Sequence, residues 1–198
     1  GVSWSATWAS EAGVAVTRDL EVAIEAARAG GRVVAKYYKG DYEVTEKGPG
    51  NPLTVADTEA DEAIKAVVTA AFPEDGWLSE ETRDSEHRLG CSRVWIVDPL
   101  DGTKEFTQQI PEFCVCVALV VDGVVEAGVS YNPVVDKLFA AARGQGTTLN
   151  GEPVRCSQET ELSRATVLAS RSETARGEWK DYEGLMQVKP TGSGAYKF

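Results

Sequence analysis

The stretch VWIVDPLDGTKEF, residues 94–106, joins an apolar run directly to two aspartates and a glycine. Its apolar half predicts a buried strand that leads into Asp98, and Pro99 predicts a turn. Gly102 and Thr103 can then begin a helix. A carboxylate at the end of a buried strand is costly without a partner, so we interpret Asp98 as part of a site. The alternative stays open, because Asp-Pro and Asp-Gly are also common turn dipeptides.

The two aspartates of this stretch lie three residues apart across the predicted turn. We therefore expect the carboxylates of Asp98 and Asp101 and the carbonyl of Leu100 to point to one spot. Hard cations such as Mg²⁺ prefer oxygen donors of this kind. Beside them, the free N–H groups of Gly102 and Thr103 at the helix start would bind an anion. The stretch thus predicts adjoining sites for a cation and an anion.

Two other segments also carry a carboxylate at the end of an apolar run or at the start of a helix. Glu80 follows an apolar run in WLSEE, residues 77–81, and Asp57 closes PLTVAD, residues 52–57, at the start of a predicted helix. Taken singly, Glu80 could be a surface residue and Asp57 a helix cap. Together with the two aspartates above, they make four carboxylates at strand ends and helix starts, where the sites of α/β proteins are built.

The rest of the chain predicts helices first, then a meandering sheet, then mixed elements. An amphipathic pattern from Thr17 predicts the first helix, and a second helix is expected to begin at a capping box of Thr58 and Asp61. Residues 47–52, KGPGNP, predict a polar loop that could act as a lid or as a plain linker. The other expected elements are strands at 76–79, 93–97, 113–121, 124–131, 137–142, 165–169 and 185–188, a helical stretch at 173–184, and tight turns at 121–124 and 149–152. This order is typical of an α+β or layered α/β fold.

Composition excludes several classes of partner. The 198 residues carry 20 basic and 31 acidic side chains, and the formal net charge of −11 argues against a nucleic acid polymer or an anionic membrane. The longest apolar run, residues 113–121, is too short for a membrane span. Because the first sixteen residues also lack the pattern of a signal peptide, we expect a cytoplasmic protein with no membrane partner.

The single histidine and the four cysteines narrow the chemistry. His87 lies in a polar run and is expected in a solvated loop, and one histidine excludes histidine-rich zinc sites. No C-x-x-C pair occurs, and Cys114 and Cys116 would share one face of a strand. We expect all four cysteines to be buried free thiols in a reducing cytosol.

Three segments, LTVAD at 53–57, LSEE at 78–81 and WIVDPLDGT at 95–103, have an order and spacing that resemble the inositol monophosphatase superfamily of metal-dependent, lithium-sensitive phosphatases. Within that superfamily, DGTKEF at 101–106 is similar to the bacterial 3'(2'),5'-bisphosphate nucleotidases, which remove the 3'-phosphate of 3'-phosphoadenosine 5'-phosphate. True inositol monophosphatases usually carry Thr-Asn-Phe or Val-Asn-Phe after the Asp-Gly pair.

The resemblance implies a layered α/β/α/β sandwich of the sugar-phosphatase type. Residues 1–150 would form an N-terminal metal-binding α+β lobe, and residues 151–198 would begin an incomplete C-terminal lobe. The partner would be a small phosphorylated substrate, either a nucleotide or a sugar phosphate. Members of the family are often dimers, so a homodimer is a further expectation.

The resemblance also implies two or three Mg²⁺ ions as cofactors. Glu80, Asp98 and the Leu100 carbonyl would hold the first ion. Asp98 and Asp101 would share the second, and Asp57 would help with a third. In such a site the cations polarise the attacking water and neutralise the phosphoryl oxygens.

Three residues would carry the catalysis that the resemblance implies. Thr103, polarised by Asp57 and assisted by Glu80, would orient the attacking water. The groups expected to contact the substrate are Asp101, Gly102, Thr103 and Ser193, with Ser170 as a further candidate.

One feature of the family does not occur among these residues. Chains of the family continue, past the point that corresponds to Phe198, into a Trp-Asp-x-Ala-Ala motif whose aspartate is a ligand of the second metal, and no Trp-Asp pair occurs here. A non-catalytic homologue and self-association near Phe198 are therefore alternatives, as are inositol-1-phosphate or another sugar phosphate as substrate. An aspartyl-phosphate mechanism of the haloacid dehalogenase type is disfavoured, because it needs aspartates two residues apart.

Overall fold

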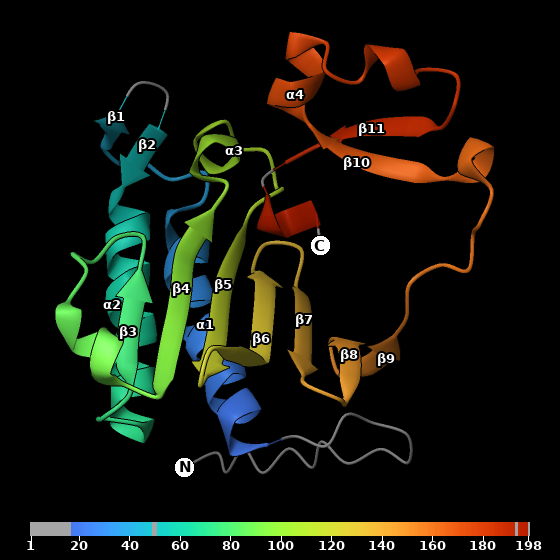
Figure 1. The fold of residues 1–198 in the computed structure, drawn as a ribbon. Helices are drawn as coiled ribbons and strands as arrows, with labels where there is room; N and C mark the ends of the chain where they lie inside the picture. Colours follow the sequence, from blue (N-terminus) through green and yellow to red (C-terminus); the bar gives the residue numbers. More distant parts are fainter. Residues whose placement is uncertain (1–16, 49–50, 193, 198) are drawn as a thin grey trace.

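The computed structural model describes residues 17–48, 51–192 and 194–197 (Figure 1). The expectations for the first sixteen residues and for Ser193 lie outside these residues, as does the centre of the expected loop at 47–52. The described helices are α1 (Arg18–Tyr37), α2 (Val55–Ala71), α3 (Thr103–Thr107) and α4 (Arg171–Arg176), with single 3₁₀ turns η1 (Glu86–Gly90), η2 (Leu162–Arg164), η3 (Lys180–Tyr182) and η4 (Ala195–Lys197).

Seven of the described strands form one mixed sheet in sequential order. The first two are parallel and all later neighbours are antiparallel. Its strands are β3 (Gly76–Ser79), β4 (Arg93–Asp101), β5 (Cys114–Val121), β6 (Val124–Asn132), β7 (Lys137–Ala142), β8 (Gly146–Leu149) and β9 (Glu152–Val154). Two smaller sheets are an antiparallel hairpin of β1 (Val44–Gly48) and β2 (Asn51–Thr54) and a parallel pair of β10 (Thr166–Ser170) and β11 (Gln187–Thr191).

The mixed α+β architecture confirms the predicted fold class. Helices α1 and α2 lie against one face of the large sheet, and β10, β11 and α4 lie near the end of the sheet that carries α3 (Figure 1). The division of the chain after residue 150 stays a prediction. In the part of the chain that the structure describes, no helix has the length and apolar character needed to cross a membrane.

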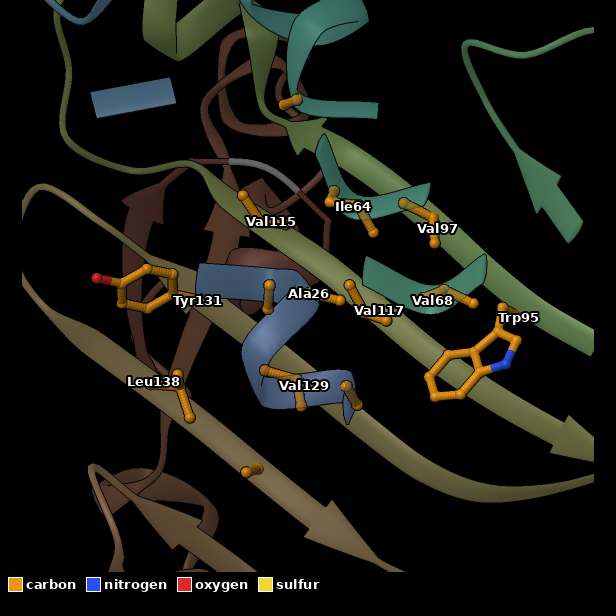
Figure 2. Close-up of a cluster of buried hydrophobic side chains, with 14 of the residues drawn as sticks. Ala26, Ile64, Val68, Trp95, Val97, Val115, Val117, Val129, Tyr131 and Leu138 are labelled. Atoms are coloured by element: carbon orange, nitrogen blue, oxygen red, sulfur yellow. The ribbon is translucent and has the colours of Figure 1, made fainter. Parts of the chain in front are cut away.

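The hydrophobic core lies between the two long helices and the sheet, and each large apolar side chain buried there stabilises the fold by about 1.5–3 kcal/mol. In α1, the Thr17 hydroxyl caps the helix and the apolar face turns inward. Figure 2 shows residues of both layers that meet in this core: Ala26, Ile64, Val68, Trp95, Val97, Val115, Val117 and Val129.

Two adjacent glycines allow α1 to pack closely against its neighbours. A Cβ on Gly31 would lie 2.5 Å from Cε1 of Tyr131, and one on Gly30 would lie 2.7 Å from Cδ1 of Ile64. Distances this short require one of the packed groups to move. The glycines thus set how closely the helix approaches the sheet.

We predict that Gly31→Ala lowers the free energy of unfolding by about 1–3 kcal/mol, because overpacking at Tyr131 outweighs the better helix propensity of alanine. Denaturant unfolding measures this change. The matched control is Gly128→Ala, since a Cβ on Gly128 meets nothing within 4 Å. Equal stability of the two variants would show that the packing between Gly31 and Tyr131 leaves room for a methyl group.

The predicted tight turns are confirmed. Asp122 and Gly123 have φ angles of 49° and 79°, and Asn150 and Gly151 have φ angles of 51° and 89°. Two successive positive φ angles are the mark of a type I′ turn, for which Asp-Gly and Asn-Gly pairs are favoured.

The predicted helix and strand boundaries need four corrections. Helix α2 begins one turn earlier than expected, with a capping box of Thr54 and Asp57 in place of the one assigned to Thr58 and Asp61. The Asp57 carboxylate accepts from the Thr54 N–H, so the earlier Thr-x-x-Asp motif is the one used. The polar segment at 47–52 is partly strand, because β1 and β2 pair from Val44 opposite Thr54 onward.

The other two corrections concern later segments. The helical stretch expected at 173–184 divides into α4 and η3, because Gly177 adopts a φ of 75° and ends α4. Strand β4 does not end in a turn at Pro99: it continues to Asp101 through an irregularity in its pairing with β5. As expected, His87 is exposed and all four cysteines are free thiols. The expected burial holds only for Cys114, because Cys91 and Cys116 are half-buried and Cys156 is exposed.

Candidate active site

The irregular end of β4 brings the first site residues together. Between Asp98 and Asp101 the register with β5 shifts, and the Leu100 N–H donates to Oδ1 of Asp98 at 3.1 Å. Gly102 follows with a φ of 95°, which favours glycine, and α3 begins at Thr103. Because α3 is little more than one turn long, its dipole is weak, and anion binding there would depend on individual N–H groups.

A cavity of about 210 Å³ opens at this end of the sheet. Three of the four predicted carboxylates line it: Glu80 from the end of β3, and Asp98 and Asp101 from β4. Every residue that lines the cavity belongs to one of the sequence segments singled out above: Pro52, Glu80, Asp98, Leu100, Asp101, Gly102, Thr103 and Lys104. Tertiary folding therefore joins segments that lie far apart in the chain.

The fourth carboxylate, Asp57, is buried behind the cavity and does not line it. Its Oδ2 accepts from the N–H and the hydroxyl of Thr54, both at 2.7 Å. The hydroxyl oxygen of Thr103 lies 2.9 Å from Oδ1 of Asp57 and 3.1 Å from the Leu100 carbonyl oxygen. Asp57 thus acts on the cavity through Thr103.

Negative charge is concentrated in the cavity. The pKa of Asp98 is raised to about 7, first by burial and then by the nearby charges of Asp101 and Glu80. The hydrogen bond from the Leu100 N–H opposes the shift. A carboxyl group with this pKa is partly protonated at neutral pH, because burial and the neighbouring carboxylates disfavour its charged form.

The donor set fits a hard divalent cation. Carboxylate and carbonyl oxygens are the ligands that Mg²⁺ prefers, and a cation would compensate the charge of Asp98 that burial and the neighbouring carboxylates disfavour. Within the described residues, no group of three or more His, Cys, Asp or Glu side chains is already arranged to hold a metal ion. Side-chain rotation would have to accompany binding, since Oδ2 of Asp101 now accepts the N–H groups of Ala195 and Tyr196 at 2.8 and 3.2 Å.

Some residues at the site have no clear signal in the sequence, and Ser170 has another role than the predicted one. Lys104 lines the cavity, and Ala195 binds Asp101, but neither was singled out as a site residue. Their signals in the sequence are weak, since a lysine and an alanine have many structural uses. Ser170, a candidate for substrate contact, accepts the Glu173 N–H at 3.1 Å and caps α4.

Helices on one face of a mixed sheet and a carboxylate-lined cavity at its end define an α+β protein with a candidate cation site. The sequence model of the Inositol monophosphatase family matches residues 16–197. The chain belongs to this family, whose members include phosphatases.

Individual relatives agree with this assignment. A histidinol-phosphatase from Chlorobaculum parvum is 38% identical over 80% of this chain and 61% of its own length. The crystal structure of the extragenic suppressor protein suhB from Bartonella henselae is 30% identical, with a TM-score of 0.83 over 91% of this chain and 73% of that one. CysQ from Bacteroides thetaiotaomicron is 32% identical, with a TM-score of 0.66 over 88% and 72% of the two chains. The chain thus spans about three-fifths of the length of the histidinol-phosphatase that it matches.

Proposed function

We propose that this protein is a Mg²⁺-dependent phosphomonoesterase. One observation carries the proposal: Glu80, Asp98, Asp101, the Leu100 segment and Thr103 line a single cavity. Bound Mg²⁺ would polarise the attacking water and neutralise the charge on the phosphoryl oxygens. Glu80, Asp98, the Leu100 carbonyl and Asp101 would hold two ions, and Asp57 would act on the site through Thr103.

The residues of the chain would position the reactants. With its hydrogen donated to Asp57, the Thr103 oxygen can accept a hydrogen from a water molecule and fix the direction of its lone pair. The N–H groups of Gly102 and Thr103 would bind phosphoryl oxygens next to that water. In-line attack on phosphorus then breaks the ester bond and releases inorganic phosphate and an alcohol.

For the substrate, we propose the 3'-phosphate of a 3',5'-bisphosphate nucleotide. The similarity of DGTKEF to the bacterial bisphosphate nucleotidases supports this choice, and Lys104 places a cation on the cavity for a second phosphate. Histidinol phosphate is a second candidate, because a histidinol-phosphatase is 38% identical to this chain. Inositol-1-phosphate is the third, on the strength of the family name.

Release of inorganic phosphate from these three substrates tests the proposal, with Mg²⁺, with EDTA and with added Li⁺. We expect activity that EDTA abolishes and Li⁺ lowers, with the nucleotide hydrolysed fastest. Activity that is unchanged in EDTA would refute the metal mechanism. Mg²⁺ binding without hydrolysis of any of the three would instead support a non-catalytic homologue.

We predict that Thr103→Val lowers kcat by about 100-fold or more, the usual contribution of a group that directs proton transfer and water in a transition state. Thr103→Ser keeps the hydroxyl that faces Asp57, so its kcat should fall by less than about 10-fold. Initial rates at saturating Mg²⁺ measure both effects. Equal activity of the valine and serine variants would remove Thr103 from the proposed mechanism.

A further inference from the structure

A second buried carboxylate on α2, Asp61, has no role in the site described so far. It lies one helical turn after Asp57 and therefore on the same face of the helix, and its residue is only 4% exposed. Its Oδ1 accepts the hydroxyl of Ser79 and its Oδ2 accepts the hydroxyl of Thr82. The capping role that the sequence suggested for Asp61 is therefore replaced by contacts to another element.

The two hydroxyls that Asp61 binds stand on either side of Glu80. Ser79 is the last residue of β3, and Thr82 closes the turn that follows it. The Ser79 hydroxyl oxygen also accepts the N–H of Glu81 at 3.2 Å, and the N–H of Glu80 donates to the Val97 carbonyl of β4 at 3.3 Å. The backbone that carries the Glu80 side chain is thus held from both sides.

Two carboxylates on one face of α2 thus bind two different segments that border the cavity. Asp57 binds Thr103, which follows β4, and Asp61 binds the turn that follows β3. Because β3 and β4 are parallel neighbours, the two contacts reach both walls of the same cavity. A rigid helix with carboxylates at i and i+4 fixes the distance between these walls.

We propose that Asp61 is a positioning residue that fixes the Glu80 turn, so that Glu80 stays on the cavity that Asp98 also lines, where both would bind one divalent cation. The inference rests on the proposed function, since it takes Glu80 as a metal ligand. Groups that orient a metal ligand without touching the metal typically change metal affinity by about 10–100-fold when they are removed. The side chain acts only through Ser79 and Thr82.

The test measures Mg²⁺ affinity by isothermal titration calorimetry and, separately, unfolding of the metal-free chain. We expect Asp61→Asn to weaken Mg²⁺ binding by about 10–100-fold, because the amide can accept only one of the two hydroxyls. The matched control is Asp75→Asn, which alters another carboxylate, one that accepts from Arg93 and Trp95 on a different part of β4. Its Mg²⁺ affinity should stay within about 2-fold of wild type.

A milder pair of variants keeps the test decisive if Asp61→Asn does not fold. Thr82→Val removes the hydroxyl and should weaken Mg²⁺ binding by about 10-fold, whereas Thr82→Ser keeps it and should bind as wild type. Wild-type Mg²⁺ affinity in Thr82→Val, with or without a loss of metal-free stability, would reduce Asp61 to a structural role and overturn the inference. Failure of the wild-type chain to bind Mg²⁺ at millimolar concentration would overturn the proposed function itself, and with it this inference.

Discussion

The Asp98→Asn substitution is expected to lower kcat for phosphate release, and the affinity for Mg²⁺, by at least about 100-fold. Asp98 lines the cavity together with Glu80 and Asp101, and the charges of these two residues raise its pKa. In the proposed mechanism its carboxylate would be shared by two ions, so the loss should reach or exceed the upper end of the effects seen for groups that only orient a ligand. Phosphate release and calorimetric titration with Mg²⁺ measure the two quantities.

Two further variants test whether the effect is particular to Asp98. Glu80→Gln should lose no more activity than Asp98→Asn, because Glu80 is assigned to a single ion. Asp122→Asn removes one negative charge at the tip of the β5–β6 hairpin, where a φ of 49° suits asparagine, and should leave both quantities unchanged. Wild-type turnover and Mg²⁺ affinity in Asp98→Asn would reject the assignment of this residue as a shared ligand.

A second large effect is expected in the stability of the metal-free protein. The pKa of Asp98 is about 7 in the folded chain, whereas its ordinary value is 3.8. Between these pH values the folded state binds more protons than the unfolded state, so the free energy of unfolding falls as the pH rises. The stabilisation is complete below about pH 4 and is lost by about pH 7, with a total contribution of about 4 kcal/mol.

Comparison of wild type with Asp98→Asn isolates this contribution from other titrating groups. In EDTA at pH 4 the two proteins should differ by less than about 1 kcal/mol, and at pH 8 the variant should be more stable by about 2–4 kcal/mol. Denaturant unfolding at the two pH values measures the difference. Mg²⁺ should stabilise wild type at pH 8 and the variant far less. A stability difference that does not change with pH would show that Asp98 does not titrate as described.

The sequence predicted much of the fold because the deciding signals are local. Apolar alternation and the Asp122-Gly123 and Asn150-Gly151 pairs depend on neighbouring residues alone, and the strands and turns that they indicated are present. The predicted start of α2 is wrong because two Thr-x-x-Asp motifs, one at Thr54 and one at Thr58, could each cap this helix. Only the packing of that helix selects between them, since it buries Asp57 beside Thr103 and Asp61 beside Ser79.

The site was predicted in its components but not in its geometry. The four carboxylates were named from the sequence, and three of them line one cavity. That Asp57 acts through Thr103, and that Oδ2 of Asp101 accepts N–H groups from Ala195 and Tyr196, could not be deduced from a pattern. These contacts join residues 46 and more than 90 positions apart.

The sequence by itself determined which residue types are available and where the strands end, because backbone preferences and the positions of Asp98, Gly102 and Thr103 are set by a few adjacent residues. Only the tertiary structure decided how β3, β4 and α2 bring Glu80, Asp98 and Asp61 together. The physical reason is that side-chain distances across packed elements, and the pKa of a carboxyl group buried among like charges, depend on the register of the whole core.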